Sequence, residues 1–141
     1  MSRRSQVLLV ALMVSVVAAV SVAQNVKKVP APYTSPASGK DMYVAHCAAC
    51  HGADGKGDGP AATALKTPPT DLTMLTKSNG GKFPDAHVFN AIKGDATIPA
   101  HGSKDMPVWG NLFMELSHGH ESEVHLRVTN LTDYVKSLQE K

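Results

Sequence analysis

The longest apolar run of the chain stands at its start. Residues 7–22 are almost wholly apolar, they follow the basic segment Met1-Ser2-Arg3-Arg4, and they lead to the small residues Ser21-Val22-Ala23. A basic, an apolar and a small-residue region in this order are typical of a cleaved secretory signal peptide. An uncleaved membrane anchor is the alternative, but the run is shorter than the roughly 20 residues that a spanning helix needs. We therefore predict a signal peptide over residues 1–23, and an exported chain in either case.

Beyond this leader, proline-rich or glycine-rich stretches alternate with helical patterns. Residues 24–38 contain three prolines and are rich in Ser and Ala, which predicts a tether or surface wrap without a function of its own. The remaining residues, 39–141, form one predicted domain. Ser38 can cap a helix that begins near Gly39 and runs into the two cysteines.

Three further segments are predicted to be helical. Residues 122–138 carry apolar residues at helical spacing, which indicates an amphipathic helix packed on the core. Shorter helices are expected near residues 61–65 and 84–93, and strand signals are weak throughout. The pattern predicts an all-α domain of short helices. Its loops are too long to be stable unless a large bound group fills the centre of the domain.

Composition limits the functions that this domain can have. The chain has 141 residues, which suits one domain, with 14 Lys and Arg against 12 Asp and Glu. Arg3 and Arg4 lie in the predicted leader, so the two kinds of charge are equal in number in the rest of the chain. We expect no nucleic-acid partner, because such binding depends on clustered Lys and Arg.

The two cysteines of the chain form the motif Cys47-Ala48-Ala49-Cys50-His51. On a helix, residues three and four apart lie on one side, so both thiols and the imidazole can face one ligand. This spacing is typical of covalent haem attachment, with Cys47 and Cys50 as thioethers and His51 as an axial ligand of the iron. We therefore predict one covalently attached haem c.

Other chemistries explain this motif less well. A disulfide would suit an exported chain, but it would leave His51 unexplained. A thioredoxin-like dithiol belongs beside a βαβ pattern, for which the sequence offers no strands. A zinc site would need a fourth ligand beyond Cys47, Cys50 and His51, and there is no second cysteine pair. His46 points about 100° away from Cys47 on a helix, so we expect it at the surface or against the haem edge.

The sixth ligand of the iron decides the function, because a filled site favours electron transfer and an open one permits ligand binding. Met106 precedes a proline that stiffens the backbone, and Trp109 can pack near the haem, so we predict Met106 as this ligand. Met42 lies on the proximal side and cannot reach across the ring. Met74 and Met114 are expected in the core, although either of them, a histidine or an open site remains an alternative.

The chain is also rich in histidine around its second half. His118, His120 and His125 lie close together in the sequence, and His101 precedes them. No cysteine or paired carboxylate completes a recognisable ligand set beside them. We therefore expect a solvent-exposed loop here rather than a second metal site.

Taken together, these residues resemble the class I cytochrome c family over roughly residues 39–141. The resemblance rests on the attachment motif, on the C-terminal helix, and on the pairs Gly59-Pro60 and Met106-Pro107. In that family the first and last helices cross where a glycine admits an aromatic residue, and Gly39, Tyr43 and Tyr134 are similar to that contact. The resemblance implies the cytochrome c fold, in which short helices wrap around one haem.

The resemblance also implies roles for residues near the haem. The carbonyl of Pro60 would accept a hydrogen bond from Nδ1 of His51 and so fix the ring. The segment Pro68-Pro69-Thr70-Asp71-Leu72 is similar to a loop that covers a haem edge in small bacterial members. The long histidine-rich connection over residues 116–124 departs from the family, where many members are shorter.

With His51 and Met106 on the iron, the sequence predicts a one-electron carrier, not an enzyme, in an extracytoplasmic respiratory chain, most simply in a periplasm. Its expected partners are redox proteins, one donor and one acceptor, and peripheral association with a membrane respiratory complex is compatible with this role. Two alternatives remain: a haem subunit of a dehydrogenase or oxidase complex, and a ligand-binding or peroxidase-type haem protein with an open iron site.

The leader generates the first prediction. When the chain is expressed with an export system, cleavage after Ala23 should leave Gln24 as the first residue of the mature protein, because Ser21 and Ala23 offer the small side chains that the peptidase selects. Intact mass spectrometry measures this directly. A full-length chain recovered in the membrane fraction would instead support the anchor.

Overall fold

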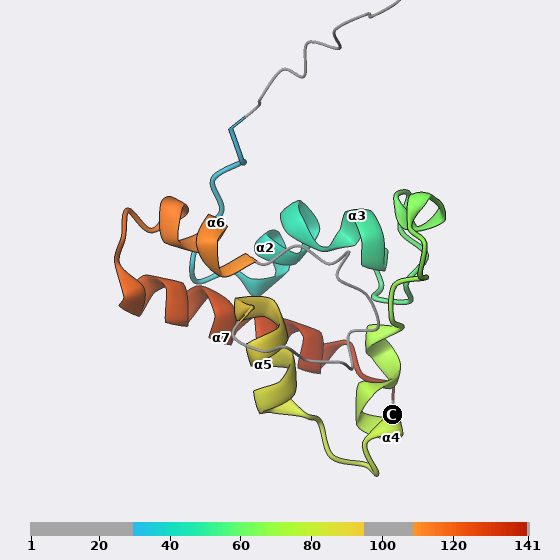
Figure 1. Ribbon diagram of the computed structural model, residues 1–141. Coiled ribbons are helices and arrows are strands. Elements are labelled where there is room, and N and C mark those ends of the chain that lie inside the picture. Colours follow the sequence, from blue (N-terminus) through green and yellow to red (C-terminus); the bar gives the residue numbers. More distant parts are fainter. Residues whose placement is uncertain (1–29, 95–108, 141) are drawn as a thin grey trace, which may run out of the picture. The chain divides into compact units, whose positions relative to one another are not determined.

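The computed structural model describes residues 30–94 and 109–140, and these residues form helices and no strand (Figure 1). The α-helices and 3₁₀ turns are, in chain order, α2 (Gly39–His46), α3 (Ala48–His51), η1 (Ala62–Ala64), η2 (Leu72–Met74), α4 (Leu75–Ser78), α5 (Asp85–Lys93), α6 (Trp109–Leu116) and α7 (Glu121–Ser137). The predicted all-α fold class is confirmed. The predicted leader lies outside the described residues.

Helix α2 begins where the sequence predicts it. The hydroxyl of Ser38 caps the helix by accepting a hydrogen bond from the Asp41 backbone N–H, with 3.2 Å between the two atoms. The carboxylate of Asp41 stands in the first turn, where the helix dipole favours negative charge. Both features stabilise the start of α2, which then places Met42 and Tyr43 in the core, each fully buried.

Helix α2 crosses α7 at Gly39 (Figure 1). A Cβ on Gly39 would overlap the carbonyl of Asn130 and would lie 2.9 Å from the Cβ of Tyr134. The rings of Tyr43 and Tyr134 pack beside this point, with their centroids 5.2 Å apart and an interplanar angle of 51°. The missing side chain at Gly39 is therefore what lets the two backbones approach, and the predicted contact of Gly39, Tyr43 and Tyr134 is confirmed.

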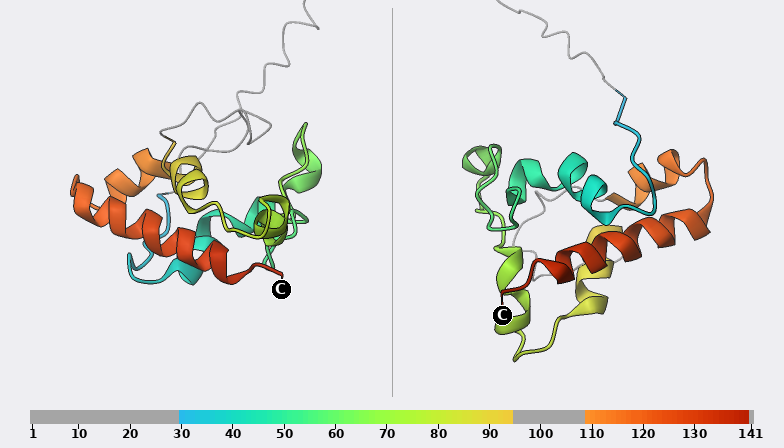
Figure 2. Two further views of the ribbon diagram at one scale, coloured as in Figure 1. Left: turned by 90° about the horizontal axis from the view of Figure 1, so that it is seen from below. Right: turned by 180° about the vertical axis from the view of Figure 1, so that it is seen from behind.

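Helix α7 is the element against which the other long helices pack. It buries one face through residues at helical spacing, namely Val124, Val128, Leu131 and Val135. Helices α2, α5 and α6 each pack against it (Figure 2). The core therefore lies along this face of α7, as the apolar pattern of residues 122–138 predicts.

A buried arginine ties the segment before α2 to α7. Arg127 is fully buried, and its Nη1 donates a hydrogen bond of 2.7 Å to the Thr34 carbonyl while its Nε donates one of 3.0 Å to the Ser117 hydroxyl. Its Nη2 lies 2.9 Å from Oε1 of Glu123, which compensates the buried charge. Within the described part of residues 24–38, Thr34 is thus buried and held against α7.

Two local features differ from the predicted helices. The helix that leads into the cysteines is interrupted, because α2 ends at His46, Cys47 caps it, and α3 starts at Ala48. The consecutive elements η2 and α4 were not predicted, although Asp71 caps η2 by accepting the Thr73 backbone N–H at 2.9 Å. Elements of three or four residues are too short for an apolar period to be recognised. The predicted helices near residues 61–65 and 84–93 are confirmed as η1 and α5.

The crossing at Gly39 generates the second prediction. Gly39→Val should lower the free energy of unfolding by about 3 kcal/mol, because the new side chain meets the backbone carbonyl of Asn130, which cannot rotate away. Lys40→Val, at the exposed neighbouring position, introduces the same residue into the same helix and should cost less than about 1 kcal/mol. Chemical denaturation of the holoprotein measures both, and equal losses in the two variants would contradict the close approach.

Candidate functional site

The attachment motif lies where α2 ends and α3 begins. The carbonyl of Cys47 accepts hydrogen bonds from the backbone N–H groups of Cys50 and His51, at 3.1 and 2.9 Å. Gly52 then ends α3 with φ at +78°, a backbone conformation that favours glycine. One short helical turn, fixed at both ends, therefore carries Cys50 and His51 next to Cys47.

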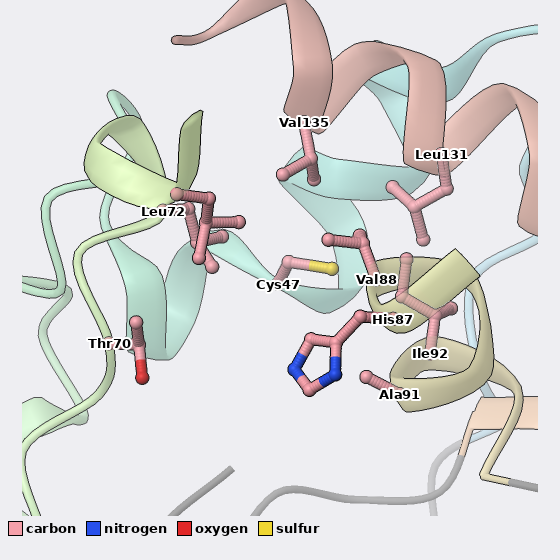
Figure 3. Close-up of a pocket in the computed structure, with 10 residues that line it drawn as sticks. Cys47, Thr70, Leu72, His87, Val88, Ala91, Ile92, Leu131 and Val135 are labelled. Carbon is pink, nitrogen blue, oxygen red and sulfur yellow. The ribbon is translucent and has the colours of Figure 1, made fainter. Parts of the chain in front are cut away.

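An apolar cavity opens beside Cys47. Figure 3 shows the Cys47 sulfur directed toward α5 at this cavity, which has a volume of about 530 Å³ when the part open to solvent is included. Its apolar lining comes from the segment around η2, from α5 and from α7: Leu72, Leu75, Val88, Ile92, Leu131 and Val135. The cavity therefore offers a large apolar group a site next to a thiol.

The thiol of Cys47 is protonated at neutral pH. Burial, together with the neighbouring Cys50, raises its pKa to about 12. A redox-active dithiol works through a thiolate whose pKa is lowered by its surroundings. The raised pKa of Cys47 is the opposite of this, and it is compatible with a cysteine that forms an uncharged thioether.

His51 is buried, and one side of its ring is held by the backbone. Its Nδ1 lies 3.1 Å from the carbonyl of Thr70. A carbonyl can only accept, so Nδ1 carries the proton and donates it, which leaves Nε2 unprotonated. Burial lowers the pKa of His51, although the hydrogen bond to Thr70 opposes this shift. A neutral imidazole with Nε2 unprotonated is the form that binds a metal.

This hydrogen-bond partner differs from the one that the resemblance implies. Pro60 is exposed, and the chain next to it turns back on α3, where the Ala61 N–H donates to the Ala49 carbonyl at 2.8 Å. The carbonyl of Thr70 occupies the place assigned to that of Pro60. The assignment of Pro60 is therefore corrected to Thr70.

A glycine-rich loop keeps the Thr70 segment against His51. The Gly57 N–H donates to the His51 carbonyl at 2.8 Å, and the Gly55 carbonyl accepts from the Leu72 N–H at 2.7 Å. A Cβ on Gly57, whose φ is +81°, would overlap the carbonyl of Pro69. This loop therefore supplies both the backbone conformation and the space that the contact with His51 requires.

His46 is buried against α6 and does not line the cavity. Its ring centroid lies 5.4 Å from that of Trp109 and 5.8 Å from that of Phe113, and its Nε2 has no hydrogen-bond partner within the described residues. Burial, assisted by Arg127, lowers its pKa. The expected surface position of His46 is wrong, because α6 covers it. Trp109 is half-buried on His46, and its contact with the haem stays a prediction.

Of the residues predicted as candidates for the second iron ligand, the structure describes only some. Met106 and His101 lie outside the described residues, so Met106 stays a prediction. Met42 is fully buried in the core, while Met74 and Met114 are half-buried. None of these three methionines lines the cavity.

The histidines near the C-terminus are exposed. His118 stands in the connection between α6 and α7 with φ at +51°, and His125 lies on α7 with its ring centroid 5.1 Å from that of Phe89. Over residues 30–94 and 109–140, no three His, Cys, Asp or Glu side chains are arranged to hold a metal ion.

Three residues of the site were not assigned these roles from the sequence: Gly57, Thr70 and His87. The glycine-rich run predicts a loop, but it does not predict the contact of Gly57 with Pro69. Thr70 belongs to the segment expected to cover a haem edge, yet its role depends on a backbone atom. His87 stands four residues before Ala91 on α5, and both line the cavity, so the helical period of residues 84–93 could have identified it.

The arrangement fits a covalent haem. Cys47 opens on an apolar cavity, the neighbouring turn carries Cys50, and His51 presents an unprotonated Nε2 while Nδ1 is held by a carbonyl. These three side chains would hold the group.

Comparison with known proteins agrees with this geometry. The protein-family model described as Cytochrome c matches residues 36–139, which is well over half of the chain and includes the attachment motif and α7. Comparison with curated proteins and with solved structures gave no match.

The glycine loop generates the third prediction. Gly57→Ala should displace the Pro69–Thr70 backbone and weaken the hydrogen bond to His51, which makes the imidazole less basic and raises the reduction potential. Gly80→Ala is the matched control, because Gly80 also has a positive φ, +68°, but its Cβ would meet nothing within 4 Å. Each change should cost about 1 kcal/mol through backbone strain.

Redox titration and the NMR signal of the His51 Nδ1–H distinguish the two variants. Only Gly57→Ala should move the potential and this signal. Equal behaviour of both variants would mean that Gly57 does not position Thr70.

Proposed function

This chain belongs to the cytochrome c family, whose members bind haem c covalently and carry electrons, and we propose that it is a one-electron carrier in a respiratory chain outside the cytoplasm, without an enzymatic activity of its own. The observation that carries the proposal is the buried, neutral His51, held at Nδ1 by Thr70 beside the apolar cavity at Cys47. This site is built to hold a metal ligand in one orientation.

When bound, the haem supplies an iron that gains and loses one electron. Cys47 and Cys50 would hold it as thioethers, and His51 would bind the iron through Nε2. The hydrogen bond from Nδ1 to Thr70 fixes the ring and increases its basicity. With the haem bound, the apolar side chains of α5 and α7 would limit the access of water to this side of the site, and low solvent access is one of the protein's means of setting a potential.

In this proposal Met106 would be the second protein ligand of the iron. Its soft thioether favours ferrous iron, so the potential would exceed that of a site with two histidines. A filled sixth position leaves a substrate no place on the iron, which supports electron transfer over catalysis.

The predicted leader, residues 1–23, supports a periplasmic location. In the described part of the chain, no helix is both long and apolar enough to cross a membrane. The proposed partners are one electron donor and one acceptor protein, met at a membrane respiratory complex or in solution. A fixed dehydrogenase or oxidase complex in the purified material would favour the subunit alternative.

The methionine ligand provides the decisive test. Met106→Ala should abolish the near-infrared charge-transfer band of the Met-to-iron bond, lower the reduction potential and let carbon monoxide bind, because the thioether that filled the site is gone. Met74→Ala and Met114→Ala are the controls. Both side chains are half-buried, so each should cost less than the roughly 2–5 kcal/mol of a fully buried methionine and keep the band.

Two results would contradict the proposal in different ways. A band that survives in Met106→Ala and vanishes in one control would move the ligand to that residue. A wild-type protein without the band, which binds carbon monoxide or cyanide rapidly, would favour the open-site alternative.

A further inference from the structure

The side chain of Gln139 joins the residues after α7 to the segment that follows Thr70. Its Nε2 donates hydrogen bonds to the carbonyls of Leu72 and Val135, at 2.6 and 3.0 Å, and its Oε1 accepts one of 2.8 Å from the Thr76 backbone N–H. A carbonyl can only accept and an N–H can only donate, so the amide has one possible orientation. Gln139 thus uses both ends of its amide to hold Leu72 and Thr76 beside the end of α7 (Figure 1).

The neighbours of Gln139 contact the same part of the protein. The Glu140 N–H donates to the Thr73 carbonyl at 3.0 Å, and a Cβ on Gly55 would lie only 3.2 Å from Cδ1 of Leu138. The elements η2 and α4, which follow Thr70, have three and four residues, and helices so short are not stable alone. Their position therefore depends on contacts with other parts of the protein, such as these with the residues after α7.

Leu72 connects Gln139 to the site. Its carbonyl accepts from Gln139 while its N–H donates to the Gly55 carbonyl at 2.7 Å, so the backbone is held on both sides of this residue. Thr70 lies only two residues earlier, and its carbonyl is the group 3.1 Å from Nδ1 of His51. Consecutive Cα atoms are about 3.8 Å apart, so a shift of Leu72 moves the Thr70 carbonyl unless the peptides between them rotate.

From these contacts we infer that Gln139 is a positioning residue of the haem site: it keeps the Thr70 carbonyl on His51 and so helps to set the reduction potential. The inference rests on the proposed function, because it requires His51 on the iron. A hydrogen bond from Nδ1 increases the basicity of an imidazole ligand, and a more basic ligand favours ferric iron. Gly57 gives the Thr70 segment the space to reach His51, whereas Gln139 holds the same segment from the side of α7.

The experiment compares three variants of the holoprotein: Gln139→Leu, Gln139→Glu and Ser137→Ala. Leu fills a similar space without any polar atom, whereas Glu, ionised at neutral pH, keeps the acceptor but loses the N–H donor. Ser137 is the control, because its hydroxyl, also at the end of α7, donates to the Tyr134 carbonyl of the same helix at 2.6 Å. Redox titration gives the potential, and the NMR signal of the His51 Nδ1–H in the ferrous protein reports the hydrogen bond to Thr70.

Gln139→Leu should raise the ferrous-to-ferric ratio about threefold at a fixed ambient potential, which is about 28 mV at 59 mV per tenfold change. It should also shift the Nδ1–H signal and speed the exchange of this proton with solvent. Gln139→Glu should change the signal in the same way, because the donor to Leu72 is gone. The signal is decisive for this variant, since its added charge also acts on the potential. Ser137→Ala should change neither quantity.

An unchanged Nδ1–H signal in both Gln139 variants would overturn the inference even if these variants unfold more easily, because Gln139 would then support the fold alone. A shifted signal without a change in potential in Gln139→Leu would overturn it as well, and Gln139→Glu remains informative if the Leu variant does not fold. Failure of the proposed function is recognised separately in the wild type. There, haem that extracts into acidified organic solvent would show that no thioethers exist, whatever the Gln139 variants do.

Discussion

The close approach of α2 and α7 at Gly39 is the constraint on which the rest of the structure depends. It is steric, since a Cβ on Gly39 would overlap the Asn130 carbonyl. Cys47 directly follows the last residue of α2, so the crossing determines where the first attachment residue lies relative to α7. Helix α7 in turn supplies Leu131 and Val135 to the cavity. One contact between distant parts of the sequence thereby sets both the attachment point and one wall of the site.

A second close approach joins two backbone segments that are nearer to each other in the sequence. Gly57 lets the Pro69 carbonyl pass where a side chain would stand, and the next carbonyl, that of Thr70, then reaches His51. The first approach joins helices, whereas the second joins loops. The first approach lies before Cys47 in the chain and the second acts at His51, so the two hold the attachment motif from its two ends.

Much of the fold follows from local sequence signals. The Ser38 cap, the apolar period of α7 and the attachment motif each depend on residues close together in the chain, and they agree with the structure. The contact of Gly39 with Tyr134 could be predicted only through the family resemblance, because no local rule joins residues so far apart. Haem attachment at Cys47 and Cys50 was likewise predictable, since the spacing itself carries the chemistry.

The remaining features depend on where separate segments meet. Thr70 takes the hydrogen-bonding role expected for Pro60, because a loop brings its backbone carbonyl to His51. Every residue has a backbone carbonyl, so the residue type does not indicate this contact. His46 is buried because α6 covers it, which the pattern of α2 alone cannot reveal. Met106 has not been placed at all, since it lies outside the described residues.

The buried Arg127 has a consequence for the response of the protein to acid. Hydrogen bonding to Arg127 lowers the pKa of Glu123, so the stability that this pair contributes is present above the unfolded pKa of Glu123 and is lost as the pH falls through the folded value. Burial lowers the pKa of His46, so the unfolded chain binds a proton there more readily and stability again falls with pH. Glu123 on α7 accepts a hydrogen bond from Ser117, directly after α6, and His46 on α2 packs against Trp109 and Phe113 of α6. Acidification therefore weakens contacts that hold α6 against both α2 and α7.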